Sequence, residues 1–179
     1  MCGRTVMPGR YQIMQDYNIR NVGKNALTYP YRAEYLPGQQ IPAIVLRRNL
    51  RLLTSMHWGF GEVYNTRLET VREKSFWAES YQERRMIFPL LAFYERHWFS
   101  TEDHVLAAAG IYRMVTKHGQ TKLEASMITQ PSHGEVEISH PRMPVFIKHH
   151  EIDQWLSGAK EIERVVDREL ENHIQCLTS

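Results

Sequence analysis

The sequence has few cysteines and no long apolar run. Its only two cysteines, Cys2 and Cys176, lie at opposite ends of 179 residues, a spacing that is not that of a metal site. No apolar run approaches the roughly 20 residues of a membrane helix. The basic start is not followed by the apolar stretch of a signal peptide. These absences predict a cytoplasmic protein with no membrane partner, whose cysteines stay as thiols.

The sequence also lacks the common metal-binding patterns. Nine histidines are present, including the pair His149 and His150, but there is no HExxH, no CxxC and no paired-carboxylate spacing. We therefore expect no metal and no cofactor. There is no internal repeat, low-complexity tract or linker, and 42% of the residues are hydrophobic. This composition predicts one domain over residues 1–179, and we expect a monomer.

Charge is unevenly distributed along the chain. Residues 1–97 hold 14 Lys and Arg against 8 Asp and Glu, a balance of +6, whereas the remainder holds 8 against 12, a balance of −4. The basic half is rich in arginine, whose guanidinium group matches phosphate oxygens. This pattern suits contact with phosphate, although a solvated basic surface would show the same balance.

Apolar periodicity predicts an α+β fold with a mostly antiparallel sheet, closed into a barrel-like core with flanking helices. Paired strands are expected at 43–48 and 50–60, and again at 104–115 and 122–130. The clearest predicted helix spans 68–85, because that stretch has no Gly or Pro and consists of good helix formers. Expected core residues include Val105, Ile111, Met114 and Phe146.

Cys2 directly follows the initiator methionine, which is normally removed when the second residue is small. Removal would leave an amine and a thiol on neighbouring carbons of Cys2. The amine can condense with an aldehyde to a Schiff base, and the thiolate can then add to the same carbon to close a thiazolidine ring. An α-amino group with a pKa near 8 is partly neutral at physiological pH. A chance Cys at this position is the alternative.

Three short polar segments stand at the edges of apolar stretches. Asn65 and Arg67 lie in "YNTRLET", Glu95 in "AFYERH", and His140 and Arg142 in "ISHPRMPVFI". A carboxyl group preceded by two aromatic residues can have a raised pKa and act as a general acid or base. His140 is a candidate second proton carrier. Each of these residues could instead be a salt-bridged or surface residue.

Taken together and in order, "MCGR", "NTRLET", "FYER" and "HPRMPV" resemble the SOS response-associated peptidase (SRAP) family, which includes the abasic-site shield protein, also described as a 5-hydroxymethylcytosine-binding protein. The resemblance runs from Cys2 to about Ile147. It implies a β-barrel-like fold with flanking helices and a role in the DNA damage response. Members recognise abasic sites in single-stranded DNA and trap the ring-opened sugar aldehyde as a thiazolidine. In a bacterium, this implies association with the nucleoid.

The resemblance also implies roles for four catalytic residues. Cys2 matches the nucleophile, and Glu95 matches a glutamate implicated in acid–base steps of ring formation and reversal. His140 matches a histidine that assists around the sugar. Asn65 matches an asparagine that orients the active site.

Four further residues match positions that bind DNA in the family. Arg4, Arg67 and Arg142 match arginines near the DNA backbone. Trp58, in "HWGF", matches a tryptophan that stacks on bases at the junction of strand and duplex. Stacking on an aromatic ring together with arginine–phosphate contact is what sequence-tolerant binding of a single strand requires.

The chain departs from the family pattern in three places. Glu34, in "AEYLPGQ", stands where the family usually has asparagine, and it adds a negative charge near the site. The loop that usually follows "HWGF" is nearly absent. "LLAFYERH" lacks the usual Gly and final Trp. Two other functions therefore stay open: a thiol-dependent peptidase that uses Cys2 with His140 as base and removes its own Met1, and a non-catalytic binder of single-stranded DNA.

Overall fold

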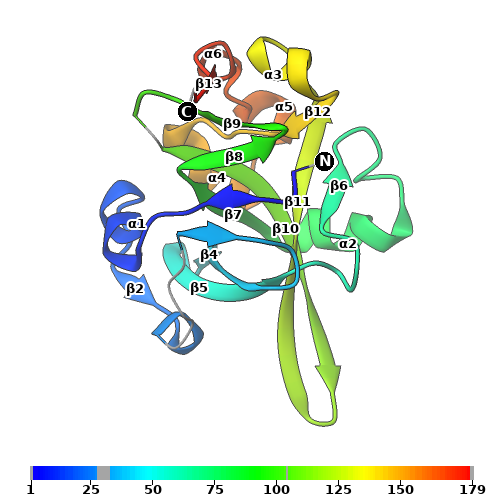
Figure 1. The fold of residues 1–179 in the computed structure, drawn as a ribbon. Coiled ribbons are helices and arrows are strands. Elements are labelled where there is room, and N and C mark those ends of the chain that lie inside the picture. Colours follow the sequence, from blue (N-terminus) through cyan, green and yellow to red (C-terminus); the bar gives the residue numbers. More distant parts are fainter. Residues whose placement is uncertain (1, 28–32, 104, 178–179) are drawn as a thin grey trace.

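The computed structural model describes residues 2–27, 33–103 and 105–177, and its centre is a closed barrel of five strands. These strands are β4 (Gln40–Arg47), β5 (Leu50–Trp58), β7 (Arg85–Leu90), β10 (Leu106–Lys117) and β11 (Gln120–Pro131). Neighbours are antiparallel in the order β11, β10, β7, β4, β5, and a parallel pairing of β5 with β11 closes the ring (Figure 1). The predicted fold class, α+β with a mostly antiparallel barrel, is confirmed.

Short strands extend the barrel on both sides of β11. β6 (Asn65–Arg67) pairs with β11 in parallel, and β12 (Arg142–Pro144) pairs with it antiparallel. β2 (Asn21–Val22) adds to the far edge, against β5. The pairings of β6 and β12 meet at one residue of β11, Thr129, which faces Arg67 on one side and Pro144 on the other. Two polar segments that are far apart in sequence thus flank the same strand.

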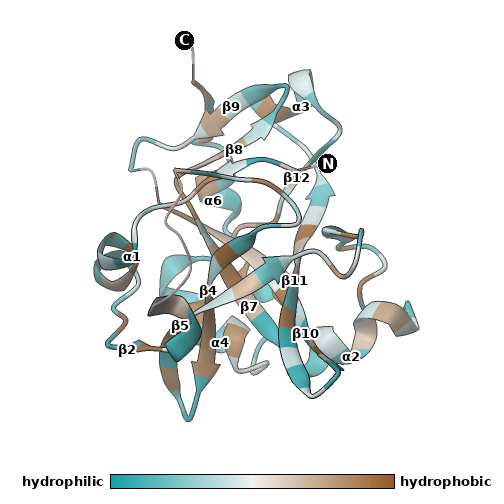
Figure 2. Ribbon diagram, turned by 60° about the horizontal axis from the view of Figure 1, so that its bottom comes forward, coloured by the Kyte–Doolittle hydropathy of each residue, from teal (hydrophilic) through white to brown (hydrophobic). Residues whose placement is uncertain are grey.

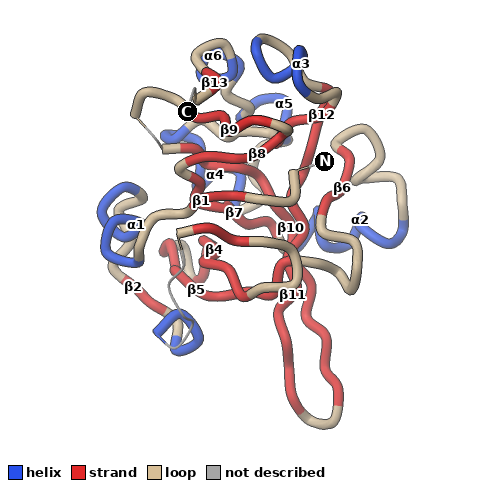
Figure 3. Tube along the Cα trace, in the orientation of Figure 1, coloured by secondary structure: helices blue, strands red, loops and turns tan. Residues whose placement is uncertain are grey.

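A second sheet lies above the barrel in the view of Figure 3. Its order is β13 (Gln175–Cys176), β9 (His97–Ser100), β8 (Ala92–Glu95), β1 (Thr5–Val6) and β3 (Glu34–Tyr35), and all its pairings are antiparallel. The pairing of β1 with β8 continues one step further, since the Tyr94 N–H donates to the Arg4 carbonyl oxygen at 2.9 Å. The start of the chain is therefore held against the end of β8.

The helices are short and lie around the strands (Figure 3). They are α1 (Arg10–Asp16), η1 (Lys24–Leu27), α2 (Ser75–Glu83), α3 (Glu135–Ser139), η2 (His149–Glu151), α4 (Ile152–Leu156), α5 (Ile162–Val165) and α6 (Arg168–Glu171). Helices of this length are marginal in water, so packing has to stabilise them. Ile13, Trp77 and Trp155 supply that packing as buried anchors of α1, α2 and α4.

The core consists of two apolar clusters, and in Figure 2 the brown, apolar segments lie mostly on the central strands. One cluster joins strand residues such as Ile44 to the helices. The other contains Phe88 and joins the barrel to Cys2 and the second sheet. At Gly110 the two strands β10 and β7 approach so closely that a Cβ atom would lie 2.4 Å from the Phe88 ring.

The β10–β11 hairpin continues beyond the barrel as an arm (Figure 1). The pairing of β10 with β7 ends at Ile111, so the residues that follow lose their cover on one side. Met114 is 56% exposed, and its predicted place in the core is wrong. Ile111 and Phe146 are fully buried, and Val105 packs partly buried against the core, as predicted.

The predicted helix at 68–85 is too long at both ends. The helix α2 covers Ser75–Glu83, residues 68–74 form turns, and Arg85 already belongs to β7. The Leu68 N–H donates to the Thr129 carbonyl oxygen at 2.8 Å, which extends the pairing of β6 with β11 past the strand. Helix propensity is a weak preference that such tertiary contacts override.

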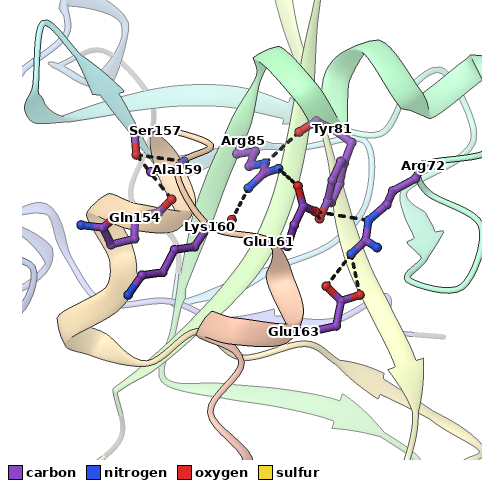
Figure 4. Close-up of polar contacts among 9 residues, drawn as sticks. All are labelled: Arg72, Tyr81, Arg85, Gln154, Ser157, Ala159, Lys160, Glu161 and Glu163. Atoms are coloured by element: carbon purple, nitrogen blue, oxygen red, sulfur yellow. Dashed lines mark hydrogen bonds and ion pairs between the residues drawn. The ribbon is translucent and has the colours of Figure 1, made fainter.

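A cluster of charged side chains ties α2 to the segment before α5 (Figure 4). Arg85, whose side chain is only 4% exposed, donates to the carbonyl oxygens of Tyr81 at 2.8 Å and Lys160 at 2.7 Å. Arg72 forms an ion pair with Glu163 nearby. Each guanidinium group is thereby paired within the fold, so we assign this cluster a structural role.

In the part of the chain that the structure describes, no helix is long and apolar enough to cross a membrane.

Candidate active site

Cys2, Asn65, Glu95 and His140 come together from four distant parts of the sequence. Asn65 Nδ2 donates to the carbonyl oxygen of Cys2 at 2.8 Å. Glu95 Oε2 lies 3.2 Å from His140 Nδ1. The charge of Glu95 also contributes to the pKa of the Cys2 thiol, so these groups share one electrostatic environment. The four residues predicted as catalytic therefore form one cluster.

Asn65 reaches the site because β6 pairs in parallel with β11, where Met127 is its partner. The side chain is 7% exposed. Its Nδ2 group holds Cys2, whereas Oδ1 is buried with no hydrogen-bond partner among the described residues. A buried polar atom without a partner costs free energy, so Oδ1 is an acceptor available to a donor that enters the site.

Glu95 is the last residue of β8 and is 4% exposed. Burial disfavours the charged carboxylate and raises the pKa of Glu95 from 4.5 to about 7. A carboxyl group with this pKa is present in both protonation states near neutral pH. It can therefore give and take a proton in the same reaction.

Cys2 is fully buried, and its Sγ lies 4.0 Å from the Arg4 carbonyl oxygen. Burial, followed by the charge of Glu95, raises the pKa of the thiol far above its ordinary value. The thiolate is the reactive form of cysteine, so burial keeps this thiol mainly in its less reactive, protonated form.

His140 follows α3, and local contacts fix its ring. The Arg142 N–H donates to His140 Nδ1 at 3.1 Å, and Nδ1 also lies 2.9 Å from the Arg142 carbonyl oxygen. The Ser132 hydroxyl donates to the His140 carbonyl oxygen. The side chain is 20% exposed, so His140 connects the buried carboxyl of Glu95 with the surface.

Two of the three predicted DNA-binding arginines have carboxylate partners. Arg4 forms a two-pronged ion pair with Glu34, at 2.6 and 3.0 Å. Arg142 pairs in the same two-pronged way with Glu69, a partner that sequence reasoning missed. Arg67 is exposed, and no carboxylate lies within 4 Å of it among the described residues. Among the described residues, Arg67 is thus the one of the three with no carboxylate in direct contact, and its charge lowers the pKa of Glu69 from a longer distance.

Trp58 does not lie on the surface, and its predicted role in base stacking is corrected. The side chain is fully buried, and its indole N–H donates to the Tyr64 carbonyl oxygen at 3.0 Å. Its ring packs against Phe88 in the core, with centroids 5.8 Å apart. A ring with no exposed area cannot stack on a base, so Trp58 stabilises the fold beneath the site.

Sequence reasoning missed two half-buried aromatic residues at the site. Tyr94 and Trp98 face each other across β8 and β9, with ring centroids 5.3 Å apart. The Arg4 guanidinium lies 5.2 Å from the first ring and 5.3 Å from the second, within the range of a cation–π contact. A prediction of a tight turn at Arg96, in "YERHW", would have placed Tyr94 opposite Trp98.

Within residues 2–27, 33–103 and 105–177, no group of three or more His, Cys, Asp or Glu side chains has the positions needed to hold a metal ion. The cluster around Cys2 instead combines one thiol, one carboxyl group, one imidazole and one amide. This donor set suits proton transfer and nucleophilic addition.

A comparison with families of known proteins decides the family. The family described as SOS response associated peptidase (SRAP) matches residues 1–177 of this chain. The chain belongs to the SRAP family. The resemblance inferred from the four motifs is thereby confirmed.

Relatives of this SRAP chain carry names that refer to abasic sites. It is 24% identical over 183 residues to the abasic site processing protein YoaM of Bacillus subtilis. The aligned region covers 88% of this chain and 79% of YoaM. It is also 24% identical over 181 residues to the abasic site processing protein YoqW of the same species, covering 88% and 80%. These names support a role of the family in abasic-site handling.

Solved structures share the fold of this chain. A protein from Bordetella bronchiseptica superposes with a TM-score of 0.80 at 17% identity, over 99% of this chain and 100% of that one. A protein from Bacteroides thetaiotaomicron gives a TM-score of 0.80 at 18% identity, over 97% and 90%. At these identities the likeness establishes the fold alone.

Proposed function

We propose that this protein binds single-stranded DNA and covalently traps abasic sites through a thiazolidine on Cys2, once Met1 has been removed. By trapping the lesion it protects the damaged strand. The observation that carries the proposal is the convergence of Cys2, Asn65, Glu95 and His140 in one buried cluster. The names of the relatives YoaM and YoqW support the same substrate.

The reaction needs an amine, a thiol and a group that moves protons. The α-amine of Cys2 attacks the aldehyde carbon of the opened sugar, and loss of one water gives a Schiff base. The sulfur then adds to the same carbon, and the proton of the thiol ends on the nitrogen. The net change is one carbon–nitrogen bond, one carbon–sulfur bond and one water released.

Glu95 is suited to assist both steps. Its protonated form gives the proton that lets the hydroxyl leave as water, and its carboxylate form takes the proton of the thiol. The pKa of about 7 that burial produces keeps both forms available at neutral pH. His140, 3.2 Å from Glu95, holds the carboxyl and links it to the surface.

Asn65 positions the nucleophile. Its hydrogen bond to the Cys2 carbonyl oxygen fixes the backbone that carries the amine. Its unpaired Oδ1 can accept a hydrogen bond from that amine or from a sugar hydroxyl. Removal of Met1 moves the α-amino group onto Cys2 itself, and the protonated form of that group favours the neighbouring thiolate.

The test of this proposal first verifies by intact mass that the purified protein has lost Met1. The protein is then incubated with single strands that carry one abasic site, and the products are separated on a denaturing gel. We expect wild type to form an adduct whose mass equals protein plus strand minus one water. Cys176→Ala is the matched control, because Cys176 is the other cysteine and lies on β13. Cys2→Ala should form no adduct, and a strand whose sugar aldehyde has been reduced to an alcohol should not react. A cross-link that persists in Cys2→Ala would refute the role of Cys2.

A second function, self-removal of Met1, is favoured by the burial of Cys2 beside Glu95. It predicts that Met1 is lost from wild type but retained in Cys2→Ser and Glu95→Gln. Cys2→Ala serves as the reference for removal by a host aminopeptidase, since alanine also permits that removal. Met1 missing from all four proteins would show that the host enzyme suffices and that self-processing is not needed.

A further inference from the structure

Arg96 forms the tip of an unusually tight turn next to the candidate active site. Glu95 at the end of β8 pairs directly with His97 at the start of β9, which leaves Arg96 alone between them. Its φ is 65°, a left-handed conformation that is unfavourable for a residue with a side chain. Residues held in such conformations cluster at functional sites, so the surroundings of Arg96 are a candidate binding site.

Arg96 lines a surface hollow of about 390 Å³ that adjoins the catalytic cluster. The opposite wall comes from the connection between β11 and β12, and it includes Ser132, Ser139 and His140. His140 belongs to both places, because its ring contacts Glu95 on the inside and borders the hollow on the outside. The hollow is therefore within reach of a strand whose sugar is held at Cys2.

The charge of Arg96 is not paired within the described part of the chain. Arg4 and Arg142 are held by carboxylates, whereas no carboxylate lies within 4 Å of Arg96. Glu95, its neighbour in sequence, is turned inward and 4% exposed. Glu137 also lines the hollow but forms no ion pair with Arg96. Arg96 thus presents an unneutralised guanidinium group at a site bordered by serine hydroxyls.

We propose that Arg96 binds a phosphodiester group of the single strand, next to the nucleotide held at Cys2, with the hollow as its subsite. This inference rests on the proposed function. A guanidinium fork matches two phosphate oxygens, and the serine hydroxyls offer further donors. Glu137 opposes the anion and limits its affinity. Arg4 and Arg142 cannot bind phosphate while they are paired with carboxylates. Arg96 and Arg67 supply the phosphate contacts instead.

The test measures non-covalent binding of an undamaged single-stranded oligonucleotide by the full chain at several salt concentrations. We expect Arg96→Gln to weaken binding about tenfold and to reduce the slope of log affinity against log salt by ~0.7, the value for one phosphate contact. Arg48→Gln is the matched control, since Arg48 is also an exposed arginine at positive φ in a hairpin turn, between β4 and β5. It should leave the slope unchanged.

Three further variants separate charge from backbone strain. Arg96→Gly relieves the strained turn while removing the charge, so it should lose affinity as Arg96→Gln does. Arg96→Lys should keep the salt slope. Glu137→Gln should strengthen binding. A loss in Arg96→Gln that is absent in Arg96→Gly would assign the effect to the turn and overturn the proposal.

The outcomes also distinguish this proposal from the proposed function. If wild type binds and cross-links the strand but Arg96→Gln matches Arg48→Gln, only the phosphate contact of Arg96 is refuted. If wild type neither binds the strand nor forms an adduct, both proposals fall.

Discussion

Replacement of Glu95 by glutamine should change the stability of the protein in a way that depends on pH. Glutamine has nearly the same shape but cannot ionise, so it mimics the protonated carboxyl group. The buried position of Glu95 favours that protonated form. The comparison of Glu95→Gln with wild type therefore measures how much the buried charge lowers the free energy of unfolding.

The magnitude follows from the pKa of Glu95. Because that pKa is about 7 in the folded protein against an ordinary 4.5, the native state binds the proton more tightly than the unfolded state. The resulting stabilisation is fully present below pH 4.5 and is lost as the pH rises through about 7. The difference between the two pKa values corresponds to roughly 3 kcal/mol. Glu95→Gln should match wild type near pH 4 and exceed its stability by about 3 kcal/mol near pH 8.

Urea unfolding between pH 4 and pH 8.5 measures this difference. Among the described residues, the side chains of Cys2 and His140 act on Glu95, and the α-amino group lowers its pKa as well. The same series on His140→Gln therefore separates the effect of Glu95 from that of the imidazole. Glu73→Gln, at an exposed turn, controls for the loss of a carboxylate elsewhere. A stability difference that stays constant with pH, or a Glu95→Gln protein that is less stable at pH 8, would contradict the reasoning.

Three other substitutions give direct readouts. Glu34→Gln frees the guanidinium of Arg4 for phosphate, so salt titrations should show tighter strand binding and a slope steeper by ~0.7. Trp58→Phe removes a buried indole N–H bond and leaves a gap, so urea unfolding should show a loss of about 1–3 kcal/mol while the adduct per folded molecule stays the same. Gly110→Ala places a Cβ against Phe88, and its melting curve should show a loss of about 1–3 kcal/mol.

Local patterns in the sequence predicted the strands well. The hairpins β4–β5 and β10–β11 were found because apolar alternation and turn residues act over a few positions. The helix at 68–85 was overextended because its first turns depend on Thr129, sixty residues away in sequence. Helix propensity carries no information about that partner.

The sequence predicted that four residues of the candidate site lie close together, but not the details of their surroundings. The order of the four motifs brought Cys2, Asn65, Glu95 and His140 into one hypothesis, and the structure places them together. The burial of Trp58 depends on the core beneath the site, which no short motif encodes. The pairing of Arg4 and Arg142 with carboxylates likewise depends on residues that only the fold brings near.

The pairing of β1 with β8 has a consequence for the order of events during synthesis. Thr5 and Val6 emerge early, but their partners Phe93 and Ala92 are made almost ninety residues later. At roughly 5–20 residues per second, the N-terminus waits on the order of 10 s for the strand that will cover it. During that interval Cys2 is accessible to the enzymes that trim new chains. If Met1 is removed in that interval, folding encloses an amine and a thiol that are already free, and the pocket closes over a finished nucleophile.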